Sequence, residues 1–142
     1  MNARGFTLVE LVTTIVVVGI LAVAALPRMF DQNVFEARGF FDETQSLLRY
    51  AQKTAVAQRR TVCVALGATG VGLTIAGAAN SNVCNTPLTL PNAPRGGTGL
   101  VPSVAAFQFR SVGGTDQVAD VTVSIAGATG TITIDRTTGY VY

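Results

Sequence analysis

Residues 6–26 have the sequence FTLVELVTTIVVVGILAVAAL, an apolar run interrupted only by three threonines, one glutamate and one glycine. As an α-helix, a run of this length reaches roughly 31 Å, about the hydrocarbon thickness of a bilayer. Residues 1–5 place one positive charge, Arg4, in front of it. Because a positive flank holds the N-terminus in the cytoplasm, we expect residues 6–26 to cross the membrane and the rest to be exported.

Three interpretations of this run compete. It could be a signal peptide, with small residues Ala22, Ala24 and Ala25 forming a cleavage site, or an uncleaved anchor. Neither needs Glu10, although an acidic residue at the centre of a membrane helix costs roughly 2.5–3.5 kcal/mol. A charge within a membrane segment indicates a function and a partner of opposite charge. A neighbouring copy of the chain could supply that cation, which is the third interpretation.

The string Gly5-Phe6-Thr7-Leu8-Val9-Glu10 resembles the leader of type IV pilins and type II secretion pseudopilins. In that family a membrane peptidase cuts after the glycine and methylates the new N-terminus. The resemblance implies cleavage between Gly5 and Phe6, N-methylation of Phe6, and pairing of Glu10 with the terminal amine of an adjacent subunit. Gly19 and Pro27 fall where many pilins carry residues that loosen the helix.

Beyond residue 26 the pattern becomes amphipathic. Apolar residues recur at helical spacings of 7, 3 and 4 residues, and two further residues widen the stripe. They are Phe41, Leu48, Ala51 and Ala55, with Phe40 and Leu47 beside them. We therefore predict that residues 27–60 form the amphipathic second half of one long helix, which lies on a folded head and ends near Arg59-Arg60.

From Thr61 onward the hydrophobic period is two, which is typical of strands. The predicted strands cover residues 61–66, 71–75, 104–110, 118–125, 130–135 and 140–142, with a hairpin between the fourth and the fifth. Residues 80–99 are rich in Pro, Asn and Gly and predict a surface loop. The expected fold is α+β, with a long N-terminal helix packed on a small antiparallel head formed by residues 61–142.

Composition excludes several classes of protein. A chain of 142 residues that is 49% hydrophobic and 13% charged is too apolar to be disordered, and it has room for one domain. It contains no histidine, which excludes a serine triad and histidine zinc ligands. We expect neither a metal nor a cofactor.

Cys63 and Cys84 are the two cysteines. In an exported head a disulfide between them is favoured, because the compartment is oxidising. The alternative is a buried Cys63 and a free Cys84.

The charged residues do not predict an enzyme. Asp42 and Glu43 are adjacent, so on a helix their side chains diverge and cannot act as an acid–base pair. Basic residues are more suggestive, because a stripe of them could bind phosphate backbones. They are Arg49, Lys53, Arg59, Arg60, Arg95, Arg110 and Arg136. Acidic residues are scattered among them, so surface charge without nucleic-acid binding is the favoured interpretation.

The helix end adds a second resemblance. Residues 47–60, followed by a strand at 61–64, resemble the H-type (GspH/FimT) group of minor pilins. Within that group, Ala-Arg-Gly-Phe at 37–40 combined with residues 49–64 most resembles the minor pilins of the mannose-sensitive haemagglutinin (MSHA) pilus. DNA-binding members of the group carry Gly-Arg-x-Arg at the C-terminus. Here residues 139–142 are Gly-Tyr-Val-Tyr, which weakens that implication. Tyr140 and Tyr142 are instead expected to pack against the head or a neighbouring subunit.

The resemblance implies a structural minor pilin, not an enzyme, that is processed by the prepilin peptidase and methylase and enters or primes a type IV pilus-like fibre. Its partners would be other pilin subunits and the assembly platform of the bacterial inner membrane. The chain would cross that membrane once, with its head in the periplasm, before reaching the pilus. Two alternatives stay open: a DNA-binding minor pilin for uptake, and the H-type pseudopilin of a type II secretion system.

Overall fold

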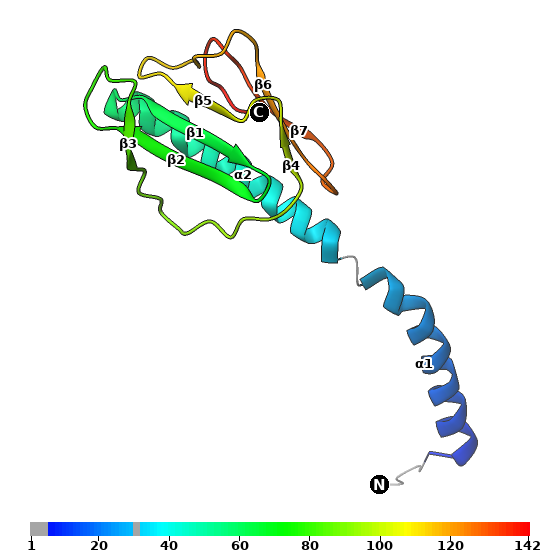
Figure 1. Ribbon diagram of the computed structural model, residues 1–142. Helices are drawn as coiled ribbons and strands as arrows, with labels where there is room; N and C mark the ends of the chain where they lie inside the picture. Colours follow the sequence, from blue (N-terminus) through cyan, green and yellow to red (C-terminus); the bar gives the residue numbers. More distant parts are fainter. Residues whose placement is uncertain (1–5, 30–31) are drawn as a thin grey trace. The chain divides into compact units, whose positions relative to one another are not determined.

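The computed structural model describes residues 6–29 and 32–142, except for the side chains of residues 24–29 and 32. The leader, including Gly5, lies outside the described residues. The chain divides into two compact units, residues 1–32 and 33–142, which are considered separately (Figure 1).

In the first unit, helix α1 spans Leu8–Met29. It includes Gly19 and continues through Pro27. Within the described part of the chain, no helix combines the length and the apolar character that a membrane crossing requires. Residues 30 and 31 are outside the described ranges, so the predicted continuity between the two helices stays a prediction.

Helix α2 spans Gln32–Gln58, and one stripe of its surface is buried. The stripe repeats every three or four residues, as a helix packed on a core requires. Its members are Ala37, Phe40, Thr44, Leu48, Ala51, Thr54 and Ala55. We had expected Phe41 at the centre, but Phe40 is buried there and Phe41 lies half-buried at its edge. Arg59 then adopts a left-handed conformation with φ of 51°, which ends the helix where the sequence predicted.

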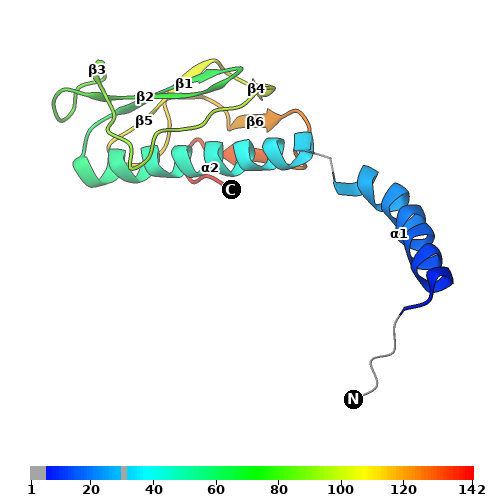
Figure 2. The ribbon, with the colours of Figure 1, turned by 90° about the horizontal axis from the view of Figure 1, so that it is seen from below.

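Two antiparallel sheets complete the second unit. The first has the strand order β3-β2-β1-β5 and the second β4-β6-β7. Figure 2 shows α2 along one face of this β layer. The strands are β1 (Val62–Gly67), β2 (Gly70–Ala76), β3 (Cys84–Pro87), β4 (Leu100–Pro102), β5 (Ala106–Phe109), β6 (Val121–Ile125) and β7 (Thr131–Ile134).

The core lies between the helix stripe and the sheets. Alternate residues of the strands are buried, because successive side chains of a strand point to opposite faces. In β6, Val121, Val123 and Ile125 are buried, and the residues between them are exposed or half-buried. Phe107 and Phe109 in β5 pack edge to face with ring centroids 5.1 Å apart.

Five of the six predicted strands overlap β1, β2, β5, β6 and β7, and the β6–β7 hairpin is confirmed. Two expectations were wrong. The predicted loop 80–99 contains β3, and residues 140–142 form an isolated bridge to β7 instead of a regular strand, although Thr133 and Tyr142 exchange backbone hydrogen bonds. Strand β4 matches none of the predicted strands. Both missed strands are short, end in proline and lack an alternating apolar pattern.

Candidate assembly sites

The first turn of α1 is capped by Thr7. Its side-chain Oγ1 accepts a hydrogen bond from the backbone N–H of Glu10 at 3.2 Å, and its carbonyl accepts one from Leu11 at 3.1 Å. The spacing Thr-x-x-Glu is that of a capping box. Glu10 therefore stands near the positive end of the helix dipole, where a carboxylate is stabilised. From the sequence, Glu10 was assigned only a pairing with the terminal amine of an adjacent subunit. The Thr-x-x-Glu spacing of residues 7–10 also indicates the cap.

The described side chains of α1 are exposed along its whole length. Residues 6–23 are all exposed, including Phe6 at 76%. The polar groups among them are satisfied locally, because the hydroxyls of Thr13 and Thr14 donate to carbonyls one turn earlier. Gly19 has open space where a side chain would be. An uncovered helix that is apolar on all sides needs a partner for its surface.

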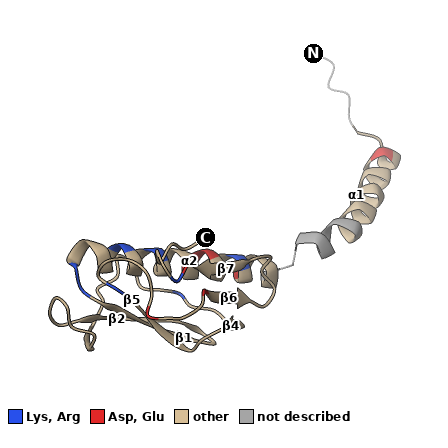
Figure 3. Ribbon diagram, turned by 90° about the horizontal axis from the view of Figure 1, so that it is seen from above, with Lys and Arg blue, Asp and Glu red and all other residues tan. Residues whose placement is uncertain are grey.

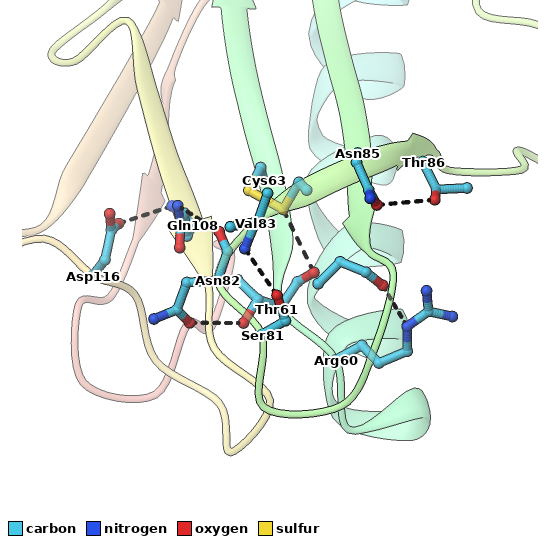
Figure 4. The surroundings of a disulfide bond; sticks show 12 residues. Arg60, Thr61, Cys63, Ser81, Asn82, Val83, Asn85, Thr86, Gln108 and Asp116 are labelled. Atoms are coloured by element: carbon cyan, nitrogen blue, oxygen red, sulfur yellow. Dashed lines mark hydrogen bonds between the residues drawn. A yellow bond between two sulfur atoms is a disulfide. The ribbon is translucent and has the colours of Figure 1, made fainter.

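The predicted disulfide between Cys63 and Cys84 is present in the head (Figure 4). It joins β1 to β3, two strands that are separated by β2 in the sheet. The segment it closes is also held by Asn82, whose side chain accepts from the Thr61 hydroxyl at 3.3 Å and whose carbonyl accepts from Gln108 at 3.5 Å. The disulfide and these bonds fix one end of the head.

Helix α2 holds the C-terminal segment through two long side chains. Arg49 donates from Nε to the carbonyl of Val141, and Gln52 donates to that of Thr138, both at 3.1 Å. Tyr140 and Tyr142 stack on one another, with ring centroids 6.0 Å apart, and are 59% and 55% exposed. The two rings are not buried in the head, because Val141 fills the buried position between them, and their packing against a neighbouring subunit stays a prediction.

A turn stabilised by Asp135 precedes that segment. The carboxylate accepts three hydrogen bonds, from the backbone of Thr137 and from the backbone and hydroxyl of Thr138. The bonds from Thr138, followed by that from Thr137 and the nearby Arg136, lower the pKa of Asp135 below its ordinary value. Gly139 follows with φ of 68°, a conformation that glycine adopts without strain.

The basic residues are not gathered into one stripe. Figure 3 shows blue segments along α2 and in loops of the head. Three of the seven arginine and lysine candidates donate to backbone carbonyls: Arg49 as above, Arg60 to Ala76 and Arg136 to Val118. Side chains used in this way contribute to the fold of the head and are less free to bind phosphates.

A groove of about 1530 Å³ runs between the N-terminal half of α2 and residues 91–98. The loop is anchored where Glu43 Oε1 accepts the backbone N–H of Arg95 at 2.6 Å. It is anchored again where Gly97 lies against the ring of Phe40 so closely that an added Cβ would clash with it. This groove could not be predicted from the sequence, because segments far apart in the chain form it.

Residues 1–26 match the family described as the prokaryotic N-terminal methylation motif. This match covers the N-terminal part of the chain. In fold, the chain is similar to the minor pilin FimU of Pseudomonas aeruginosa, which superimposes in two crystal forms with TM-scores of 0.53 and 0.51. The two matches are 23% and 21% identical, covering 75% and 74% of this chain and 87% and 90% of the respective FimU chains. These identities show the fold alone.

A curated relative is PilA5 of Thermus thermophilus, described as the major component of a type IV narrow pilus. It is 37% identical over 62 residues, which is 44% of this chain. The match spans about half of PilA5, 53% of its length. FimU thus resembles this chain in fold, and PilA5 resembles it in sequence over 62 residues.

Proposed function

We propose that the chain is a structural, non-enzymatic pilin subunit that enters or primes a type IV pilus-like fibre. One observation carries the proposal: Glu10 is the lone carboxylate among exposed apolar side chains, one turn after Phe6. Glu10 would pair with the terminal amine of an adjacent subunit. The exposed surface of α1 would then be buried against other helices, which contributes about 25 cal/mol for each Å² removed from water.

Processing is part of the proposal. The peptidase would cut between Gly5 and Phe6, methylate Phe6, and leave residues 6–26 as a membrane anchor with the head on the periplasmic side. The match to the methylation motif over residues 1–26 supports this step. The H-type and MSHA assignments rest on the strings at residues 37–40 and 47–64. The alternatives are a DNA-binding minor pilin for uptake and the H-type pseudopilin of a type II secretion system.

Mass spectrometry of the intact protein from native membranes tests the processing. We expect a chain that begins with N-methylated Phe6. A chain that begins near Leu26 would indicate a cleaved signal peptide, and a chain that retains Met1 would indicate a plain anchor. Either outcome would contradict the proposed pathway.

Two matched variants separate the two roles of Glu10. Glu10→Gln keeps a residue that suits a capping box but removes the charge, whereas Thr7→Ala removes the cap and keeps the charge. Losing one partner of a buried ion pair costs about 3–5 kcal/mol, but losing a helix cap costs only about 1 kcal/mol. We expect Glu10→Gln to reduce incorporation into fibres on the order of a hundredfold or more, and Thr7→Ala about tenfold or less. Incorporation of Glu10→Gln at the wild-type level would refute the pairing role.

A further inference from the structure

The two ends of α2 differ in net charge. Towards its N-terminus, the groove under residues 91–98 is lined by Glu36, Asp42 and Glu43 and by one cation, Arg95, and Arg38 is a second cation on this part of the helix. Towards its C-terminus, positions 49–60 carry four cations and no carboxylate. In Figure 3, the red segments of α2 lie in its N-terminal half, beside a blue one, and the C-terminal half has blue segments alone.

Each end also offers an exposed apolar side chain. Phe35 lines the groove and is 72% exposed, and Val56 lies between Lys53 and Arg59 and is 47% exposed. An apolar centre with a charged rim is the usual composition of a protein–protein contact. The acidic groove thus matches the basic end in charge and in apolar character.

The two ends cannot meet within one molecule. At about 1.5 Å per residue, Asp42 and Arg59 are roughly 26 Å apart along the axis of α2. Complementary surfaces on opposite ends of one body form a heterologous contact, which repeats from copy to copy and can build an open filament instead of closing a dimer.

We infer that the basic end of α2, formed by Lys53, Val56 and Arg59, docks in the acidic groove of a second copy of this chain. The inference rests on the proposed function, because it names a head-to-head contact within the fibre. Exposed ion pairs each contribute only about 0–1 kcal/mol, so the contact is weak between isolated chains. In a fibre, where other contacts already hold the subunits together, its role is to set register.

Lys53 makes the contact testable, because it is the one lysine of the chain. A zero-length carbodiimide reagent joins an amine to a carboxylate that it touches. Lys53 and Asp42 of one chain are about 16 Å apart along the helix, so a link between these positions must join two molecules. We expect the full chain in detergent micelles to give dimers linked from Lys53 to Glu36 or Asp42, with a yield that falls at high salt.

A complementation experiment tests whether the link joins Lys53 of one molecule to the groove carboxylates of another. One variant carries Glu36→Gln and Asp42→Asn and lacks the acceptor carboxylates, and the other carries Lys53→Arg, which keeps the charge but lacks the amine. Neither variant alone should give the link, and their mixture should give it between the intact groove of one and Lys53 of the other. Arg59→Glu in the wild-type background should reduce the yield at least threefold.

The reaction of Glu36 and Asp42 with carbodiimide and a small added amine verifies that they are accessible. If they react but no link to Lys53 forms, or if Lys53 links to other carboxylates, the inference is overturned. This measurement uses purified chains and does not depend on processing at Phe6. Failure of the head contact is thus distinguishable from failure of the proposed pilin function.

Discussion

Removing the disulfide should destabilise the head by about 3 kcal/mol. Cys63 and Cys84 are 21 residues apart in sequence, and the bond joins strands that are not neighbours in the sheet. In the chain-entropy model, a cross-link of this length restricts the unfolded chain and contributes about 3 kcal/mol at 25 °C. With a urea dependence of about 1–3 kcal/mol per molar, the unfolding midpoint of the double Cys→Ala variant should fall by about 1–3 M.

Near-ultraviolet circular dichroism of the full chain is a suitable assay. The chain has no tryptophan, and its three tyrosines, Tyr50, Tyr140 and Tyr142, all lie in the second unit, residues 33–142. The signal therefore reports this unit and not α1. Reductant should lower the midpoint of the wild-type protein by a similar amount and should leave the Cys63→Ala/Cys84→Ala variant unchanged.

A loss of stability below about 1 kcal/mol would refute the reasoning, because the constraint on the unfolded chain would then not be the origin of the effect. A loss well above 5 kcal/mol would also contradict it. That result would indicate that the bonds around Asn82 cannot hold β3 on the sheet without the covalent link.

Three further predictions concern the head, and chemical denaturation or NMR titration of the full chain checks them. Thr44 is fully buried, and its hydroxyl has no hydrogen-bond partner within the described structure. Thr44→Val should therefore stabilise the head by about 1–2 kcal/mol. Destabilisation would indicate that the hydroxyl has an unseen partner. Gly97→Ala should destabilise it by about 1–3 kcal/mol, because the new Cβ meets the ring of Phe40, whereas Gly70→Ala, with open space, is the control and should lack this clash. The pKa of Asp135 should lie below its ordinary value, so its stabilising contribution is present above about pH 4 and lost as pH falls through the lowered pKa. Asp135→Asn should weaken this acid dependence, and an unshifted pKa would contradict the role of the turn.

Most of the fold could be predicted from local pattern. The apolar run at residues 6–26, the helical stripe ending at Arg59 and the alternation in β1, β2, β6 and β7 are signals within short windows. The error at Phe40 and Phe41 shows the limit of such signals. Both residues fit a helical stripe, and only the position of the sheets decides that Phe40 faces the core.

Among the candidate sites, only contacts between residues close in sequence could be predicted. The cap of Thr7 on Glu10 spans three residues and could have been found from the Thr-x-x-Glu spacing. The bonds from Arg49 to Val141 and from Arg95 to Glu43 join residues 92 and 52 positions apart. No window of sequence contains both partners, so these bonds depend on how the head folds.

The apolar surfaces of α1 and α2 differ in how far the folded chain covers them. One stripe of α2 is fully covered by the sheets, so the head can fold before any assembly takes place. The side chains from Phe6 to Val23, which include all the described side chains of α1, are exposed, so this apolar surface requires another environment. In the proposed function, that environment is first the bilayer and later other helices of the same kind. A single chain can then be stable in the membrane before assembly. It still gains free energy on assembly, because the apolar surface of α1 that is buried in the fibre is not part of the core of the head.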